Sequence, residues 1–252
     1  MTTLAAAAPA WTAPPADVRI GDREVHAWRL PLTPSEPRLE AMLDTLSAGQ
    51  RARAARFHFE RDRRRYVASE GLMREILARY LGVAPAEIRF EYGRRGKPAL
   101  ARAPWLRFNL SRSHELALLG VTRSREIGVD VERVRDLGDW ELIAKHFFAE
   151  AERQALAGLP PDLRIPGFFN CWTRKEAYVK AVGDGLYQAL DSFTVSLAPE
   201  QPARLVSVAD DPAETARWRV EHVRPEPGYV GALFVEGWDW ELACWSASPV
   251  AR

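Results

Sequence analysis

The stretch FFNCWTRKEAYVKAVGDGL, residues 168–186, decides the fold because it predicts a well-defined helix that also carries chemically active side chains. Residues 172–182 contain neither glycine nor proline, and many of them are good helix formers. We expect Pro166 and Gly167 to break the chain before the helix, and Gly183 and Gly185 to end it. The sequence therefore predicts one helix with both ends marked.

Three side chains of this stretch share one helical face. Trp172, Glu176 and Lys180 follow one another at i, i+4 and i+8, which places an acid and an amine beside a large aromatic ring. Such an acid and amine can be a simple surface pair worth only about 0.3 to 0.5 kcal/mol. They belong to a functional site only if other segments supply groups that complete it.

The composition is that of an ordinary globular protein. Its 252 residues, 47% of them hydrophobic, can bury a substantial core as one large domain or two small lobes. Lys plus Arg number 35 against 34 for Asp plus Glu. This balance leaves no global electrostatic case for nucleic acid or an anionic membrane as the main partner.

Cysteine usage and hydropathy favour a cytoplasmic location. Cys171 and Cys244 are the two cysteines, too few for a disulfide framework or a CxxC zinc site, which favours a reducing compartment. No apolar run approaches the roughly 18 to 20 residues of a transmembrane helix, and the N-terminus does not look like a secretory signal. Residues 1–16, rich in Ala and Pro, are expected to form a flexible tail.

A helical pattern with a basic first half follows an expected strand at residues 24–32, in which Pro31 favours an edge strand or the last position. The pattern covers residues 50–81 and stops at Gly82. Its basic run consists of Arg51, Arg53, Arg56, Arg61, Arg63, Arg64 and Arg65. The run is either a solvated helical face paired with nearby acids or an anion-binding site, and the pattern leaves both open.

Two further segments are rich in hydrogen-bond donors. GRRGKP, residues 93–98, is a basic turn whose glycines let backbone N–H groups approach an anion. SRSHE, residues 111–115, connects two expected strands at residues 105–110 and 116–122. The GxxxxGK[ST], GxGxxG, GxSxG and HExxH motifs are all missing, so the sequence indicates neither those nucleotide-binding loops nor a protein nucleophile.

Residues 127–132, IGVDVE, have the period of a strand. One face is apolar, and the other carries Asp130 and Glu132 with their Cα atoms about 7 Å apart and with Gly128 beside them, which leaves room for a ligand. Two neighbouring carboxylates repel each other, so the pattern indicates either an exposed strand end or a site for a hard cation such as Mg²⁺. Glu176 would complete a set of oxygen ligands that leaves positions for water and phosphate oxygens. Lys180, one turn farther along the helix, would then face the same phosphates.

The C-terminal part alternates turns with strands, and its tryptophans are expected to be core residues without a ligand role. The expected strands are residues 192–197, 204–208, 218–223, 229–236 and 238–245.

In this order, the motifs GRRGKP, FNLSRSHE, GVDVE, WTRKEAYVKAVGDGL and LDSF make the chain resemble the Sfp-type 4′-phosphopantetheinyl transferases over about residues 53–193. That family transfers the phosphopantetheine arm of coenzyme A to a serine of an apo acyl or peptidyl carrier protein, and it releases adenosine 3′,5′-bisphosphate. The carrier protein supplies the nucleophile, which agrees with its absence from the motifs of this chain.

The resemblance implies a role for each candidate residue. Asp130, Glu132 and Glu176 would hold Mg²⁺ against the pyrophosphate of coenzyme A, and Lys180 would contact the transferring phosphate. Glu176, or a water that it orients, would act as the base. The residues implied in binding coenzyme A are Arg53, Arg65, Lys97, Ser111 and Arg112. Arg112 departs from the family pattern, which has histidine there, so a role specific to an imidazole is not implied.

The resemblance also implies an α+β fold of two pseudo-symmetric lobes, each a small antiparallel sheet packed against a long helix, with the active site in the cleft between them. We assign residues 17–124 to an N-terminal lobe that binds the nucleotide, and residues 125–252 to a C-terminal lobe with the acids and the catalytic helix. Two lobes in one chain favour a monomer. The alternatives are a non-catalytic coenzyme A-binding module and a nucleic-acid-binding protein, whose affinity would fall steeply with salt.

Overall fold

A computed structural model describes residues 10–93, 96–183, 189–209 and 211–247 of the chain. Its helices are α1 (Glu36–Thr45), α2 (Ala48–Ala54), α3 (Glu60–Leu81), α4 (Trp140–Phe147), α5 (Glu150–Ala157), α6 (Pro161–Val182) and α7 (Glu214–Arg217), with short 3-10 helices η1 (Pro85–Glu87) and η3 (Leu190–Ser192). Its strands are β1 (Glu24–Pro31), β2 (Phe90–Tyr92), β3 (Pro98–Leu100), β4 (Leu106–Ser113), β5 (Leu116–Arg123), β6 (Ile127–Arg133), β7 (Phe193–Val195), β8 (Leu205–Val208), β9 (Trp218–Val223), β10 (Tyr229–Glu236) and β11 (Glu241–Ser246). None of the helices in these ranges is long and apolar enough to cross a membrane.

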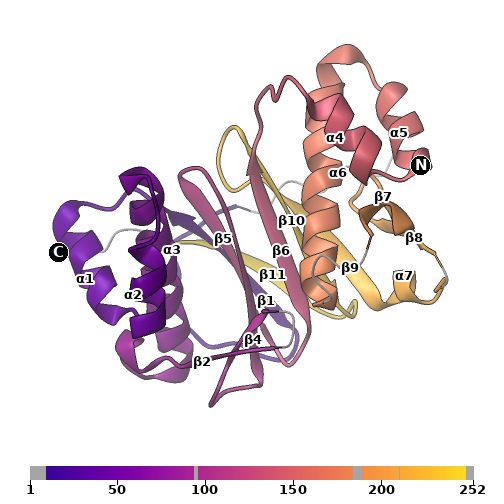
Figure 1. Cartoon of the computed structure of the whole chain (residues 1–252). Helices are drawn as coiled ribbons and strands as arrows, with labels where there is room; N and C mark the ends of the chain where they lie inside the picture. Colours follow the sequence, from indigo (N-terminus) through magenta and orange to yellow (C-terminus); the bar gives the residue numbers. More distant parts are fainter. Residues whose placement is uncertain (1–9, 94–95, 184–188, 210, 248–252) are drawn as a thin grey trace.

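The strands form the middle of the molecule, with α1–α3 on one side and α4–α6 on the other (Figure 1). One sheet has the order β11-β1-β5-β4 and the other the order β6-β10-β9, while β2-β3 and β7-β8 are separate pairs. The long helices α3 and α6 each have 22 residues and each end at a left-handed glycine, Gly82 at φ 65° and Gly183 at φ 78°. The α+β class predicted from the sequence is confirmed.

Three apolar cores hold these layers together. The first lies between α1–α3 and the first sheet, and the second packs α6 against the second sheet. The third joins the two sheets to each other and includes Leu118 of β5, Val129 of β6 and Leu233 of β10, all fully buried. Because the two sheets share this third core, the two halves of the chain are packed as one unit.

The long helical pattern at residues 50–81 is divided in the structure. α2 begins at Ala48 and ends at Ala54, and Ser47 is its N-cap: the Ser47 side chain accepts from the Gln50 amide, while the Gln50 side chain accepts from the Ser47 amide. The chain then turns before α3 starts at Glu60. The sequence offers no glycine or proline for this break, and we find no physical account of it beyond the packing of Phe57 against Tyr66 at 5.3 Å between ring centroids.

The start of α6 differs from the prediction. The helix begins at Pro161, whose missing N–H costs nothing in the first turn, and Pro166 lies inside it. Position 167 favours glycine because Leu159 of the preceding loop packs closely against it: a Cβ at Gly167 would lie 2.5 Å from Leu159 Cδ1. Gly183 ends the helix as expected, whereas Gly185 lies outside the described residues.

The first sheet corrects three further expectations. β1 is a central strand between β11 and β5, so the edge alternative is wrong, and Pro31 is its last residue. β11 comes from the range assigned to the C-terminal lobe, yet it pairs in parallel with β1. The first sheet is therefore mixed, and the C-terminal lobe does not include all of residues 125–252. Thr12, in the expected tail, exchanges backbone hydrogen bonds with Cys244 and Ser246 at 3.1 and 2.8 Å.

Candidate active site

Helix α6 crosses strand β6 at Gly128, and this crossing builds the site. A Cβ at Gly128 would overlap the carbonyl oxygen of Ala177 and the backbone nitrogen of Ala181. The glycine thus leaves room for the helix backbone, not for a ligand as the strand pattern suggested. As a result, Lys180 of α6 comes within contact distance of Asp130, two residues farther along β6.

Asp130 is the most enclosed of the predicted acids, with 3% of its surface exposed. Its Oδ1 accepts from Lys180 Nζ at 2.6 Å and from Ser111 Oγ at 2.6 Å. Lys180 Nζ also lies 3.2 Å from Ser111 Oγ. Asp130 Oδ2 is buried and has no hydrogen-bond partner among the described residues. A buried carboxylate with one free oxygen is ready to accept another donor or a cation.

Strands β4 and β6 belong to different sheets, and polar side chains of β4 join them. Asn109 Oδ1 accepts from Val129 N at 2.9 Å, Ser111 donates to Asp130, and Ser113 Oγ donates to Glu132 Oε2 at 2.6 Å. Three alternate residues in the second half of β4 therefore reach β6. We call these pairs the side-chain ladder.

The ladder corrects the position assigned to Ser111 and Arg112, which lie within β4 and not in a turn. The turn begins one residue after the strand, at His114, which has a φ of 52°. Asn109 and Ser113 were not predicted as site residues. Their signal is the alternation N-x-S-x-S, which matches the period of D-x-E in β6.

Burial and mutual repulsion weaken the acids of the site. The pKa of Glu132 is raised to about 7, first by burial and then by the charge of Asp130, while the hydrogen bond from Ser113 opposes the shift. The pKa of Glu176 is also raised, first by burial and then by Asp130, while Lys180 lowers it. Asp130 therefore interacts electrostatically with both other acids.

The three acids lie around the same crossing without forming a closed cluster. In the described ranges, no three His, Cys, Asp or Glu side chains lie close enough together to hold a metal ion. The donor set nevertheless fits a hard cation, since it offers carboxylate oxygens, one of them buried and unpartnered, and two acids with raised pKa values. A cation would relieve both the repulsion and the missing partner.

Lys175, next to Glu176 in the chain, connects α6 to three neighbouring elements. Its Nζ donates to Glu152 Oε2 at 2.8 Å and to the carbonyl oxygens of Leu190 and Phe193, both at 2.6 Å. Both members of the Lys175–Glu152 pair are fully buried. This pair ties α5, η3 and β7 to α6, and it was not predicted from the sequence.

Arg53 and Arg112 are brought together by Tyr66 of α3. Their guanidinium carbons lie 5.3 and 5.4 Å from the centre of its ring. Arg112 also donates to Ser69 Oγ at 3.1 Å and pairs with Glu70 Oε1 at 3.3 Å. Two of the predicted coenzyme A residues thus form one cationic group beside α3.

Glu70 continues this group into the protein interior. Its Oε2 accepts from Gln50 Nε2 at 2.6 Å, and Gln50 Oε1 accepts from Arg74 Nε at 2.9 Å. Arg74 is 1% exposed and also donates to two backbone carbonyls near η1. Sequence reasoning missed Glu70, because a glutamate in a helical pattern gives no sign of the arginine it meets from β4.

The other predicted coenzyme A residues are placed elsewhere. Arg65 pairs with Glu115 Oε1 at 3.4 Å and Asp62 Oδ1 at 3.8 Å, beside the turn between β4 and β5. Ser111 is in the ladder, and Lys97 contacts the C-terminal end of α6. The phosphate-binding roles of these residues stay predictions.

The chain thus combines an α+β fold with a row of acids that faces a lysine of α6. A family described as "4'-phosphopantetheinyl transferase superfamily" matches residues 126–234, and one described as "4'-phosphopantetheinyl transferase, N-terminal" matches residues 28–123. Over 238 residues the chain is 40% identical to the 4′-phosphopantetheinyl transferase HetI of Nostoc, a match that covers 93% of this chain and 97% of HetI. The chain belongs to the 4′-phosphopantetheinyl transferase superfamily.

Other similarities cover less of the chain. It is 30% identical over 163 residues to the 4′-phosphopantetheinyl transferase Sfp of Bacillus subtilis, which covers 65% of this chain and 71% of Sfp. Among solved structures, the holo-[acyl-carrier-protein] synthase of Thermotoga maritima aligns with a TM-score of 0.36 and 23% identity, over 44% of this chain and 62% of that one.

Proposed function

We propose that the protein transfers the 4′-phosphopantetheine group of coenzyme A to a serine of an apo acyl or peptidyl carrier protein. The observation that carries this proposal is the contact of Lys180 with Asp130 at the crossing of α6 and β6, in a chain that belongs to the superfamily. The serine oxygen would form a bond to the phosphorus of the pyrophosphate that carries the pantetheine arm. The bond from that phosphorus to the bridging oxygen would break, and adenosine 3′,5′-bisphosphate would leave.

Asp130, Glu132 and Glu176 are the residues that would hold Mg²⁺. Their support is the unpartnered buried Oδ2 of Asp130 and the raised pKa values of the two glutamates. When bound, the ion would neutralise part of the charge of the pyrophosphate.

Lys180 and Glu176 are the side chains proposed to act on the reacting groups. Lys180 would exchange its contact with Asp130 for one with the transferring phosphate, where an ammonium stabilises developing negative charge. Glu176 lies one helical turn from Lys180, on the same helical face, and is the carboxylate proposed as the general base. It would accept the proton of the serine directly or through a water.

The group formed by Arg53, Arg112 and Tyr66 is proposed to bind the 3′-phosphate of coenzyme A. Its support is the convergence of two guanidinium groups on one aromatic ring, a geometry suited to charge-assisted hydrogen bonds with a dianion. Arg65, Lys97 and Ser111 remain in the predicted nucleotide-binding set. A carrier protein is thus the protein partner, and no nucleic acid or membrane is needed.

We further propose a cytoplasmic monomer. The support for a monomer is that both halves of the site come from one chain and share an apolar core. The support for a reducing compartment is that both cysteines are free and buried. Light scattering over a range of dilutions tests the first point, and an active trimer that loses activity on dilution would contradict it.

Mass spectrometry of a small panel of apo carrier proteins tests the function. The protein, coenzyme A and Mg²⁺ should add one phosphopantetheine arm to the serine of at least one carrier, and chelation of Mg²⁺ with EDTA should stop the reaction. Asp130→Asn keeps the shape of the side chain and should also stop it. A protein that binds coenzyme A but modifies no carrier would instead be the non-catalytic module.

A further inference from the structure

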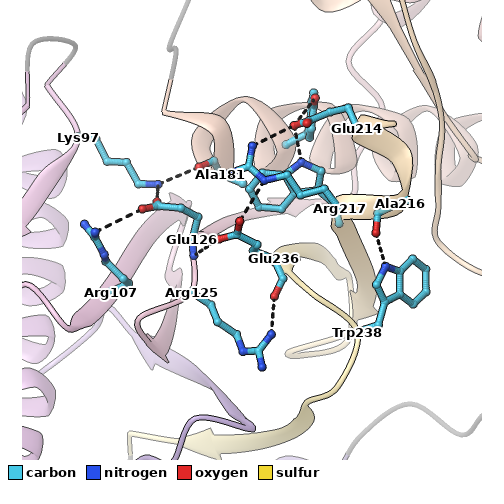
Figure 2. A network of polar contacts seen from close by, with 12 residues as sticks. Lys97, Arg107, Arg125, Glu126, Ala181, Glu214, Ala216, Arg217, Glu236 and Trp238 are labelled. Atoms are coloured by element: carbon cyan, nitrogen blue, oxygen red, sulfur yellow. Dashed lines mark hydrogen bonds and ion pairs between the residues drawn. The ribbon is translucent and has the colours of Figure 1, made fainter. Parts of the chain in front are cut away.

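Lys97 lies at a junction between the two halves of the chain. It comes from the segment before β3, and its Nζ contacts Glu126 Oε2 at 3.0 Å and Ala181 O at 3.1 Å (Figure 2). The same Nζ lies 3.2 Å from the carbonyl oxygen of Ile127. An ammonium group has three N–H donors. Each donor of Lys97 thus has an acceptor inside the protein, and a phosphate would have to displace one of them.

The contact with Ala181 completes the end of α6. The last four carbonyls of a helix have no partner within it, and they carry its negative partial charge. The Gly183 amide donates to the carbonyl of Val179, and Lys97 donates to that of Ala181. Lys97 therefore acts as a side-chain cap for the turn that carries Lys180.

The same ammonium fixes the start of β6. It donates to the carbonyl of Ile127. It also pairs with Glu126, whose amide is in turn 3.3 Å from Glu236 Oε2 (Figure 2). Ile127 precedes Gly128, the residue on which α6 crosses β6. Lys97 consequently holds helix and strand together one residue away from their closest approach.

We propose that Lys97 is a positioning residue that fixes Lys180 relative to Asp130 by capping α6 and joining it to β6. The inference rests on the proposed transferase function. It replaces the direct contact with coenzyme A that the family resemblance implied for Lys97.

The test compares Lys97→Met, which removes the three donors, with Lys97→Arg, which retains the charge and several donors. Arg107→Met is the matched control, because Arg107 approaches the other oxygen of Glu126 at 3.7 Å and no contact with α6 is found for it in the described residues. The measurements are kcat and KM with coenzyme A and with dephospho-coenzyme A, and amide hydrogen exchange at residues 179–183.

Lys97→Met should lower kcat by the same factor for both donors, about 10- to 100-fold, as expected when a reacting group is misplaced by about 1 Å. The KM for coenzyme A should stay nearly constant, and exchange at the end of α6 should become faster. Lys97→Arg should restore most of kcat, and Arg107→Met should behave like the wild type. Glu126→Gln keeps Lys97 and is a second variant, expected to lower kcat for both donors less strongly.

Two results would overturn the proposal. A higher KM for coenzyme A alone, with kcat unchanged, would make Lys97 a contact of the 3′-phosphate. Unchanged exchange at residues 179–183 in Lys97→Met would show that it does not hold the helix. If the wild type transfers no arm, the proposed function fails, and the exchange measurement still decides whether Lys97 fixes α6.

Discussion

Glu132 shows, at the scale of one residue, that a side chain of the proposed site lowers the stability of the metal-free protein when it is ionised. Its carboxyl is partly buried beside Asp130, and its pKa is raised to about 7. The folded protein therefore binds this proton more tightly than the unfolded chain does. The stabilising contribution of the neutral acid is present below the unfolded pKa of about 4.5 and is lost as the pH rises to about 7.

Glu132→Gln should consequently stabilise the metal-free protein at alkaline pH. We expect a gain of about 1 to 3 kcal/mol in the free energy of unfolding near pH 8 and almost none near pH 4.5. Urea denaturation in EDTA at the two pH values measures the difference. Glu141→Gln, on the exposed part of α4, is the control and should have little effect at either pH. An equal gain at both pH values would mean that ionisation of the Glu132 carboxyl does not lower the free energy of unfolding.

Arg53 and Arg112 lead to a second prediction at this scale. Arg53→Ala or Arg112→Ala should weaken coenzyme A by about 1.5 to 3 kcal/mol, the range for a hydrogen bond to a charged group, and should hardly change the use of dephospho-coenzyme A. Glu70→Gln should act in the same direction, because Arg112 loses its ion pair. Arg51→Ala, in the same basic run, is the control, because the described residues show no contact of Arg51 with the Tyr66 ring. If Arg112→Ala lowers kcat equally with both donors, Arg112 acts on the transferring phosphate instead.

At the scale of elements, Gly128 is the position on which the site depends most. Gly128→Ala would place a methyl group against the backbone of α6, which cannot move aside as a flexible side chain can. We expect a loss of about 1 to 3 kcal/mol or more in stability, together with a fall in kcat as Lys180 moves away from Asp130. Thermal melts and steady-state kinetics measure the two effects.

The control for this prediction is Gly49→Ala in α2. A Cβ at Gly49 meets nothing within 4 Å, so alanine there should raise helix stability by about 0.5 to 1 kcal/mol. A Gly128→Ala variant as stable and active as Gly49→Ala would contradict the close crossing of α6 and β6.

The elements also show which parts of the fold the sequence could predict. Strand β6 and the end of α6 at Gly183 were predicted correctly, because a period of two and a left-handed glycine are local signals. Pro166 misled the prediction of the helix start, since a proline near the N-terminus of a helix is tolerated. The glycine in IGVDVE was attributed to a ligand because its true neighbour, α6, lies about fifty residues farther along the chain.

For the candidate site, too, local signals could be predicted from the sequence and distant neighbours could not. The contact of Lys180 with Asp130 joins the two segments that the sequence pattern combined, and the roles of Asp130, Glu176 and Lys180 stay predictions. The side-chain ladder and the pair of Glu70 with Arg112 were missed, because each depends on which strand or helix comes to lie beside another. Such distant pairings are set by tertiary packing and leave no local signal.

At the scale of the whole molecule, the core between the two sheets should make the protein unfold as one unit. Leu118 is fully buried there. Leu118→Ala should lower the free energy of unfolding by about 2 to 5 kcal/mol, as large-to-small core substitutions do. Calorimetry should give a single transition in the wild type and in the variant, with equal calorimetric and van't Hoff enthalpies. Two separate transitions would mean that the halves are stable independently.

The pairing of β11 with β1 has a consequence for biosynthesis. Glu24 pairs with Glu241, so the central strand of the first sheet lacks one neighbour until the segment around Glu241 has been synthesised. The amino-terminal half is therefore unable to complete its sheet during translation, although domains commonly fold in the order of synthesis. Because the loop between β1 and β11 must close before the final hydrogen bonds form, we expect the last folding step to be slow and the open edge of β1 to be able to pair with other chains in the interval.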